Sequence, residues 1–362
     1  MTEIVAAESI RKRPGMFIGD TRDGSGLAHM VWEVVANSID EHLAGMCSRI
    51  SVEIQANGAV SVEDDGRGIP VEVVGDVCVA ERILTSFHNS PSFDGHAPHT
   101  HVGKHGVGIF VVCALSANLE LSVHRGGRHW RQRFEKGYAV SRLEDAGPTG
   151  RTGTRLTFVP DPAVFSGRPL DGSVILERLT ELAFLNPGLL LDFVDKRCHR
   201  LNQPRGLAGH LEDTARDAPI ASTFTFAGTI EDISVDVAAR WGVHDDASIL
   251  SFANVEQTTG GGTHVQGLTA GLSEGLKRTA PDLCQRYPAK ERAKVIARNL
   301  RALICVRLND PSYDSPTKSI LSTPRVKGIA KTAVARAFAE FLSKEPGLVS
   351  HFGKLLTNGR DR

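Results

Sequence analysis

Apolar residues change their spacing several times along the first 160 residues, and each spacing predicts an element. Over residues 26–43 they recur on one side of a helix while acids and amides recur on another, which predicts an amphipathic helix. Alternation at 50–54 and 60–62, on either side of the turn pair Asn57-Gly58, predicts two hairpin strands. A helix is also expected at 107–115, and strands are expected at 119–123, 130–134 and 156–158. The first half is therefore expected to be α+β, with a helical layer on a largely antiparallel sheet.

The second half begins near residue 213 and shows the same two kinds of spacing. Strand-like stretches at 222–226 and 233–238 precede a glycine-rich turn at 260–262. Helices are then expected at 265–278, 289–301 and 326–344, with a strand at 303–308 between the last two. A chain of this length is long enough for two domains, each with its own core. We expect them to be residues 1–212 and residues 213–362.

The composition of the 362-residue chain is that of an ordinary globular protein, with 41% hydrophobic and 23% charged residues. No run approaches the roughly 18 consecutive apolar residues of a membrane span, and the first residues lack the basic and then apolar layout of a signal peptide. The six cysteines stand singly and far apart, which is typical of reduced thiols rather than of a disulfide framework. We therefore expect a cytoplasmic protein with no membrane segment.

The formal net charge is zero, because 42 Lys and Arg balance 42 Asp and Glu. That balance excludes a uniformly basic nucleic-acid coat and an acidic disordered tail. It hides an asymmetry, because residues 288–362 hold 15 Lys and Arg against 6 Asp and Glu, a net charge of +9. The basic segment is either a solvated surface or a face that meets DNA phosphates, and the size of the excess favours DNA.

Glu33 and Asn37 are the first candidates for chemistry. They stand four residues apart on the predicted helix, so their side chains point the same way. A carboxylate can accept a proton from water, and an amide oxygen can bind a hard cation such as Mg²⁺. The alternative is a solvated helix face that also includes Asp40 and Glu41.

Three glycine-rich segments could meet a nucleotide. Asp64, at the end of a predicted strand, can accept a hydrogen bond from an exocyclic amine such as adenine N6, and the following Gly66 and Gly68 allow a flat ligand to approach closely. Residues 103–108 precede an apolar helix, where backbone amides can meet phosphate oxygens. Residues 150–154 open a strand. Taken singly, each segment is equally compatible with an ordinary turn.

In this order and spacing, the segments resemble the GHKL ATPase family. The pattern is a helical Glu-x3-Asn, then Asp-x-Gly-x-Gly, then a long loop ending in Gly-x2-Gly-x-Gly, then a Gly-Thr-Gly-Thr-like turn. Further matches resemble the N-terminal region of the B subunits of DNA gyrase and of topoisomerase IV (ParE), at 10–21, 29–35, 105–108, 114–116, 182–186, 261–264 and 316–318. The resemblance implies a GHKL (Bergerat) ATP-binding α/β sandwich followed by a transducer domain of the ribosomal-S5-domain-2-like fold.

The resemblance also implies a role for each motif residue. Glu33 would be the general base, and Asn37 would hold Mg²⁺ beside the phosphates of ATP. Asp64 would bind adenine N6 with support from Thr154, and Arg67 would lie against the adenine face as a cation–π partner. The pocket would be completed by Gly66, Gly68, Ile69 and Pro70, and the triphosphate would be wrapped by Gly103, Lys104, His105, Gly106, Val107 and Gly108.

Lys318 would reach the γ-phosphate from the second domain, so that ATP links the two domains and hydrolysis releases the link. The chain departs from the family pattern around this lysine and in the lid. Pro316-Thr317-Lys318 stands where the family has Gln-Thr-Lys, and 90–93 is Ser-Pro-Ser-Phe where the lid has Gly-Gly-Lys-Phe. Ala36 also replaces an aspartate. Such changes are typical of a divergent member or a paralogue.

Four histidines in the predicted lid could in principle bind zinc. We disfavour a zinc site, because no cysteine joins them and a lid over phosphates has to move. They are His96, His99, His101 and His105.

The resemblance implies an ATPase module of a type IIA topoisomerase that couples Mg·ATP binding and hydrolysis to closure of a dimer gate and to DNA strand passage. The expected partners are a second copy of the chain, double-stranded DNA along the basic segment, and a gyrase A- or ParC-like subunit. The short segment before Ile10 weighs against a dimer that exchanges N-terminal arms. No acidic TOPRIM cluster is present, so DNA cleavage by this chain alone is not expected. The alternative is a nucleotide-gated regulatory protein with little ATP turnover.

Overall fold

The computed structural model describes residues 3–75, 77–87, 107–215, 217–243, 247–315 and 317–358. The chain divides into two compact units, Met1–Gln203 and Pro204–Arg362. Helix α7 (Gly206–Asp213) contacts β13 (Ile233–Trp241) and β16 (Leu300–Arg307) of the second unit. The boundary expected from the sequence, between 212 and 213, falls at the C-terminal end of this helix.

The described strands of the N-terminal unit form a mostly antiparallel sheet in the order β11-β10-β1-β2-β9-β5-β6-β7, with β8 paired to β6. The pair β1–β10 is parallel. The hairpin expected around Asn57-Gly58 is confirmed as β1–β2. The strands are β1 (Arg49–Ile54), β2 (Val60–Asp64), β5 (Ser116–Arg125), β6 (Arg128–Glu135), β7 (Tyr138–Ala139), β8 (Glu144–Pro148), β9 (Gly153–Pro160), β10 (Leu190–Val194) and β11 (Cys198–Leu201); β3 (Val73–Val74) and β4 (Val77–Cys78) pair separately.

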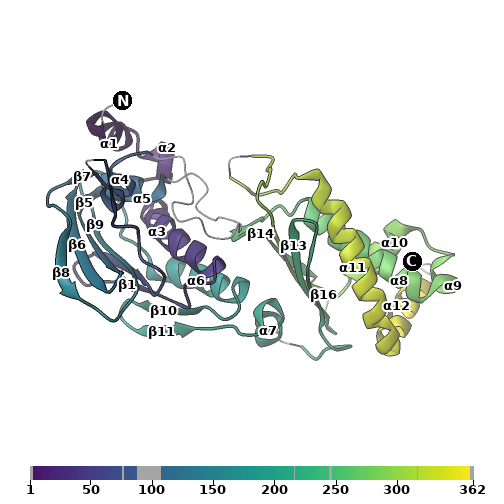
Figure 1. The fold of residues 1–362 in the computed structure, drawn as a ribbon. Helices are drawn as coiled ribbons and strands as arrows, with labels where there is room; N and C mark the ends of the chain where they lie inside the picture. Colours follow the sequence, from purple (N-terminus) through teal and green to yellow (C-terminus); the bar gives the residue numbers. More distant parts are fainter. Residues whose placement is uncertain are drawn as a thin grey trace. The chain divides into compact units, whose positions relative to one another are not determined.

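Helices cover one face of this sheet (Figure 1). The amphipathic helix expected at 26–43 is confirmed as α3 (Ser25–Leu43), which buries its apolar stripe of Val31, Val34 and Val35. The apolar helix expected at 107–115 is confirmed as α5 (Gly108–Ala114). The other helices of the unit are α1 (Glu3–Lys12), α2 (Gly15–Ile18), α4 (Val79–Thr85) and α6 (Gly172–Leu185). The α+β class expected for this half is therefore confirmed.

The C-terminal unit has a second sheet, in the order β12-β13-β16-β14-β15. The helix expected at 289–301 is wrong at its end, because α10 (Ala289–Ala297) stops and β16 begins at Leu300. The backbone leaves the helical conformation at Arg298, which is extended, and Asn299 follows in the left-handed region with φ +58° before β16 begins. β16 pairs with β13 on one side and β14 on the other. The hydrogen bonds to these two strands favour a strand from Leu300 onward over the continued helix that the local pattern predicts. The remaining strands are β12 (Phe224–Ile230), β14 (Ser248–Ala253) and β15 (Glu256–Gln257).

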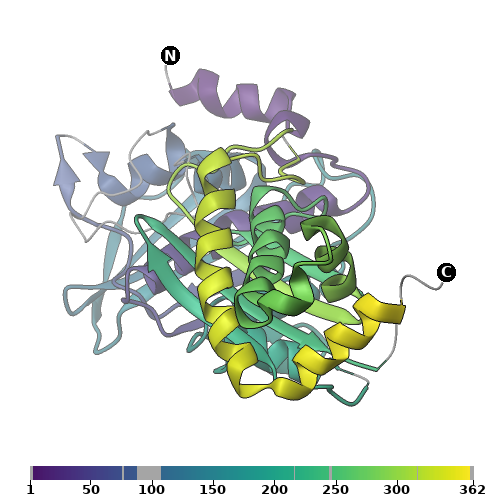
Figure 2. The same cartoon turned by 90° about the vertical axis from the view of Figure 1, so that its right-hand side faces the viewer.

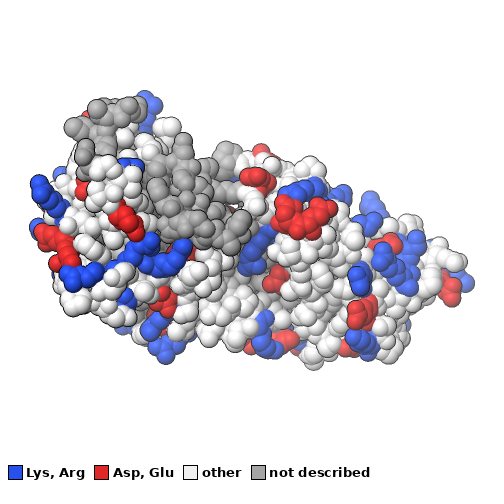
Figure 3. Space-filling model, in the orientation of Figure 1, with Lys and Arg blue, Asp and Glu red and all other residues white. Residues whose placement is uncertain are grey.

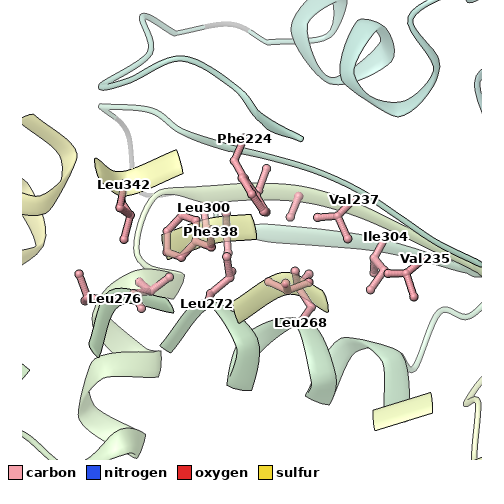
Figure 4. Close-up of a cluster of buried hydrophobic side chains, with 14 of the residues drawn as sticks. Phe224, Val235, Val237, Leu268, Leu272, Leu276, Leu300, Ile304, Phe338 and Leu342 are labelled. Atoms are coloured by element: carbon pink, nitrogen blue, oxygen red, sulfur yellow. The ribbon is translucent and has the colours of Figure 1, made fainter. Parts of the chain in front are cut away.

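Two long helices, α8 (Thr263–Thr279) and α11 (Pro324–Lys344), lie side by side over this sheet (Figure 2). They confirm the helices expected at 265–278 and 326–344. Apolar side chains from the sheet and from both helices point toward one another and form one core (Figure 4), including Phe224, Val235, Val237, Leu268, Leu272, Leu276, Leu300, Ile304, Phe338 and Leu342. The unit is completed by α9 (Pro281–Cys284) and α12 (Pro346–Asn358).

Glycines allow α8 and α11 to approach closely. A Cβ added to Gly271 would lie 2.7 Å from the Val334 Cβ and 2.9 Å from the Lys331 carbonyl oxygen. Gly267 and Gly275, one helical turn away on either side, meet Ala330 and Phe338 in the same way. The spacing of these glycines therefore sets the distance between the two helices.

We expect Gly271→Ala to destabilise the C-terminal unit by about 1–3 kcal/mol, because its Cβ would overlap a backbone oxygen and a rigid Cβ. Gly328→Ala on α11 is the matched control, because a Cβ there meets no atom within 4 Å and should stabilise the helix by up to about 1 kcal/mol. Urea unfolding of both variants checks the prediction. Equal effects of the two substitutions would show that helix propensity, not close packing, governs position 271.

Candidate active site

The Glu33 and Asn37 side chains lie on the same face of α3, as their spacing predicts. The Nε2 atom of His29, one turn earlier, lies 3.0 Å from Glu33 Oε1. The side chain of Glu33 is 31% exposed, so water can reach its carboxylate. Asn37 is exposed and donates its Nδ2 to the Glu33 carbonyl oxygen at 2.6 Å, which leaves its own Oδ1 atom as the possible ligand for a cation. His29 orients the carboxylate, a role that the sequence pattern did not reveal.

Gly108, the first residue of α5, packs against the Glu33 carboxylate. A Cβ at position 108 would lie 1.9 Å from Glu33 Oε2, so only glycine fits without moving the carboxylate. The last glycine of the 103–108 motif is therefore placed beside Glu33, with Val107 preceding it. The remaining motif residues (Gly103, Lys104, His105 and Gly106), the lid residues 90–93 and the four lid histidines lie outside the described residues.

Asp64 lies at the end of β2 and accepts three hydrogen bonds within the protein. Ser38 Oγ donates to Oδ2 at 2.8 Å, while the backbone N–H groups of Gly66 and Thr154 donate to Oδ1 at 3.0 and 3.2 Å. Burial raises the pKa of Asp64 to about 6, against an ordinary value of 3.8, although these hydrogen bonds favour the ionised form. At neutral pH the group is an anionic acceptor to which an exocyclic amine could donate.

The loop after Asp64 is held against β5 and β9 by close backbone contacts. Gly68 has φ +81°, and a Cβ there would lie 2.9 Å from the His124 carbonyl oxygen. Gly153 has φ +127°, and a Cβ there would lie 1.9 Å from the Asp64 carbonyl oxygen. Thr154 Oγ1 accepts a hydrogen bond from the Ile69 N–H at 3.0 Å. Thr154 thus joins the Asp64 carboxylate to the Gly68-Ile69-Pro70 segment. Gly68 and Gly153 have no side chains, which permits these backbone segments to lie close together.

Arg67 is held by Glu41 of α3. The guanidinium donates from Nε and Nη2 to the two Glu41 oxygens at 3.0 and 2.6 Å, and the Arg67 backbone N–H donates to the same carboxylate at 3.1 Å. A bidentate pair of this kind fixes the plane of the guanidinium. The sequence pattern places Glu41 on the same side of the helix as Glu33, eight residues earlier, but it left a solvated helix face open as the alternative. Stacking of Arg67 on a base stays a prediction.

The raised pKa of Asp64 makes a testable prediction about stability. Between about pH 4 and 6 the folded state keeps a proton that the unfolded chain has released, so this contribution to stability, about 3 kcal/mol, is lost as the pH rises through that range. Asp64→Asn lacks this titration. The free energy of unfolding of the wild type minus that of the variant should therefore fall from pH 4 to pH 6 and then level off. A constant difference across this range would contradict the shift.

Lys318 lies in the C-terminal unit, on the loop before α11. Its Nζ atom is 3.1 Å from Glu256 Oε1, and both side chains are about half exposed. Pro316 of the same motif lies outside the described residues. The lysine is therefore accessible to a ligand and already has an anionic neighbour within its own unit.

The basic segment 288–362 is not uniformly available to a ligand. Arg292 is buried and donates to the Tyr287 carbonyl oxygen at 2.6 Å, and Arg325 forms a bidentate pair with Asp232. On the face drawn in Figure 3, Lys and Arg lie among Asp and Glu rather than in one continuous basic field. The exposed cations of α10 and α11 include Lys290, Lys294, Lys327, Lys331 and Arg336.

Within the described ranges, no three His, Cys, Asp or Glu side chains form a group that could hold a metal ion. The same part of the chain contains no helix long and apolar enough to span a membrane.

Two family models match the chain. The model described as the histidine kinase-, DNA gyrase B- and HSP90-like ATPase matches residues 22–163, and the model described as DNA gyrase B matches residues 206–358. The first range contains Glu33, Asn37, Asp64 and Thr154. The second contains Lys318.

Two DNA gyrase B proteins are similar in sequence to almost the whole chain. The DNA gyrase B protein of Synechocystis sp. is 37% identical over 359 residues, which cover 94% of this chain and 33% of that relative. The DNA gyrase B protein of Streptococcus pneumoniae is 36% identical over 357 residues, which cover 94% of this chain and 54% of that relative. The chain thus spans between one third and about half of the length of these curated relatives.

Solved structures resemble the chain over nearly its whole length. The 43K ATPase domain of Thermus thermophilus gyrase B, in complex with an aminocoumarin, has a TM-score of 0.85 and 28% identity and covers 98% of this chain and 94% of its own. The ATP-binding domain of Francisella tularensis topoisomerase IV, in complex with a small-molecule inhibitor, has a TM-score of 0.78 and 26% identity, with 97% of both chains covered. The expected sandwich and transducer folds are confirmed by these likenesses together with the second model match.

Proposed function

The chain belongs to the gyrase B-like branch of the GHKL ATPases, and we propose that it is the ATP-binding and hydrolysing module of a type IIA DNA topoisomerase. In this proposal, ATP binding and hydrolysis drive closure of a dimer gate and passage of a DNA duplex. One observation carries it: a single helix, α3, carries Glu33 and also binds, through its next two turns, Asp64 and Arg67 of the Asp-x-Gly-x-Gly loop. Helix α3 thus fixes both Glu33, the proposed general base, and the loop residues that are proposed to contact the adenine.

Hydrolysis in this site uses Glu33 as the general base. The carboxylate accepts a proton from the water whose oxygen attacks the γ-phosphorus, and the bond to the leaving ADP oxygen breaks. His29 holds the carboxylate orientation, and Gly108 keeps the other oxygen of Glu33 clear of side chains. Lys318 contacts the γ-phosphate in the nucleotide-bound state and stabilises the charge there.

The residues present fit a magnesium ion. Asn37 has one amide oxygen left for a ligand, and Mg²⁺ commonly takes one or two protein oxygens together with phosphate and water oxygens. When bound, the ion would offset the charge of the phosphate oxygens. Asn37 is the residue of this chain that would hold it.

Recognition of the base rests on Asp64. Adenine presents an amino group at N6 that can donate to this carboxylate, whereas guanine presents a carbonyl oxygen that would face it unfavourably. Thr154 keeps the Asp64 carboxylate and the Ile69-Pro70 segment in register. Gly66 and Arg67 complete this side of the site.

Double-stranded DNA is the proposed partner of the C-terminal unit. The exposed Lys327, Lys331 and Arg336 of α11 carry the positive charge of this unit outward, and such contacts to phosphates bind a duplex without reading its sequence. A second copy of the chain and a gyrase A- or ParC-like subunit are the other proposed partners. The six cysteines are free thiols, which supports a cytoplasmic location.

Phosphate release by the purified chain, measured with ATP or GTP and with or without duplex DNA, tests the proposed function. We expect hydrolysis that depends on Mg²⁺ and prefers ATP, and Asp64→Asn should reduce ATP binding as well as turnover. Binding of ATP without turnover would instead indicate the nucleotide-gated regulatory protein. Absence of ATP binding by the folded chain would contradict both functions.

A further inference from the structure

The ammonium group of Lys318 has an anionic partner that belongs to the same unit. Lys318 Nζ lies 3.1 Å from Glu256 Oε1, and the two residues are 62 positions apart in the chain. Glu256 is on β15, which pairs with the end of β14 through Ala253 and Phe252. Because both residues lie in Pro204–Arg362, this ion pair forms without any group of the N-terminal unit. The lysine that is proposed to bind a phosphate is therefore already paired with a carboxylate before any phosphate binds.

The backbone at Lys318 has an unusual conformation. Its φ is +56°, in the left-handed region that residues with a Cβ seldom adopt, and its N–H donates to the Ser315 carbonyl oxygen at 3.1 Å. Residues in such conformations persist where the surrounding structure enforces them and are concentrated at functional sites. The loop thus presents the lysine side chain in one defined direction.

The glycine turn at 260–262 anchors this loop. The Gly260 N–H donates to the Ser319 carbonyl oxygen at 2.9 Å, and the Leu321 N–H donates to the Gly261 carbonyl oxygen at 3.0 Å. A Cβ on Gly260 would lie 2.5 Å from Ile320 Cγ1, and one on Gly262 would lie 2.2 Å from the Leu321 carbonyl oxygen. The consecutive glycines are required for this contact. It holds the loop that carries Lys318, here called the lysine loop, beside the strand that carries Glu256.

The Glu256 carboxylate also acts on the other side of the loop. Tyr313, which forms a bridge with Leu321, is half-buried, and its burial followed by the nearby Glu256 charge raises the pKa of the phenol to about 12. The carboxylate is therefore a local source of negative potential for the whole lysine loop. A phosphate that binds the ammonium group therefore has to replace this nearby negative charge.

We propose that Glu256 is the resting counter-ion of Lys318, which the γ-phosphate must displace, so that the lysine engages only a nucleoside triphosphate. This inference rests on the proposed contact between Lys318 and the γ-phosphate. Glu256 is a positioning and specificity residue, since it acts through Lys318. Exposed ion pairs of this kind change an equilibrium constant by roughly two- to fivefold, which sets the size of the expected effect.

Calorimetric titration of Glu256→Gln with a non-hydrolysable ATP analogue and with ADP tests the proposal. We expect the variant to bind the triphosphate about two- to fivefold more tightly than the wild type, with ADP affinity unchanged and with the difference shrinking at high salt. Glu340→Gln is the matched control, because Glu340 pairs with Lys344 at 3.4 Å on the exposed face of α11 and is not part of the lysine loop. Triphosphate affinity that is unchanged or weaker in Glu256→Gln overturns the proposal, as does an equal gain for ADP.

The Lys318→Ala variant separates this inference from the proposed function. If Lys318→Ala weakens triphosphate binding and the double variant with Glu256→Gln behaves like Lys318→Ala alone, Glu256 acts through the lysine, as proposed. If Lys318→Ala has its effect but Glu256→Gln equals the wild type, the role of Glu256 is wrong and the proposed function stands. If Lys318→Ala changes neither binding nor hydrolysis, the proposed role of Lys318 fails and the inference fails with it.

Discussion

Replacing Glu33 by glutamine should lower steady-state ATP hydrolysis by roughly 10²- to 10⁴-fold while ATP affinity changes little. Glutamine has the size of glutamate and still accepts a hydrogen bond from His29, but it cannot take the proton of the attacking water. The carboxylate that is proposed as the base has one oxygen 3.0 Å from His29 and the other against Gly108. Phosphate release and equilibrium ATP binding, measured on the same preparation, separate the chemical step from binding.

Glu120→Gln is the matched control for this substitution. Glu120 is an exposed carboxylate on β5 that lies 3.5 Å from Arg131, and its replacement removes a charge from the same unit without touching α3. Hydrolysis should remain at the wild-type rate in this control. If Glu33→Gln also turned over ATP at that rate, Glu33 would not be the base, and another proton acceptor would have to be sought.

Lys318→Ala should reduce hydrolysis by about 10²- to 10³-fold, because loss of one preorganised cation at the γ-phosphate removes transition-state stabilisation of that order. The affinity for ADP should stay within about twofold of the wild type, since ADP has no γ-phosphate for the lysine to contact. Phosphate release and ADP titration are the two measurements. A large loss of hydrolysis with an unchanged affinity for ADP is the signature of a group that binds the terminal phosphate rather than the adenine.

Lys344→Ala controls for the loss of a positive charge in the same unit. Lys344 is exposed at the end of α11 and pairs with Glu340, as Lys318 pairs with Glu256. The control should retain full hydrolysis. An unaffected rate in Lys318→Ala would mean that the C-terminal unit does not act on the phosphate in this way, whatever the N-terminal unit does.

Local pattern was sufficient for most of the elements that carry the site. The apolar stripe of α3, the turn pair between β1 and β2, and the glycines before α5 are signals within one or two helical turns, and the structure confirms the elements they predict. The pattern was insufficient at 289–301, where α10 ends at Ala297. Residues from Leu300 onward join two neighbouring strands, and strand partners lie far away in the chain. The spacing of apolar residues therefore does not show where α10 ends and β16 begins.

The sequence by itself indicated the family, most of the elements and the candidate residues for the chemistry, because motif spacing and hydrophobic period are local properties of a chain. The tertiary structure alone decided which neighbours those residues have. Ser38 binds Asp64 and Glu41 binds Arg67, whereas the pattern left open that Glu41 belongs to a solvated face.

The same holds for Glu256, which no motif contains and which meets Lys318 across 62 positions of sequence. Contacts of this kind arise when segments distant in the sequence pack next to each other, and the local spacing of apolar residues holds no information about such packing. The candidate reactive groups can therefore be identified one by one from the sequence, while the side chains that contact them are visible only in the folded protein.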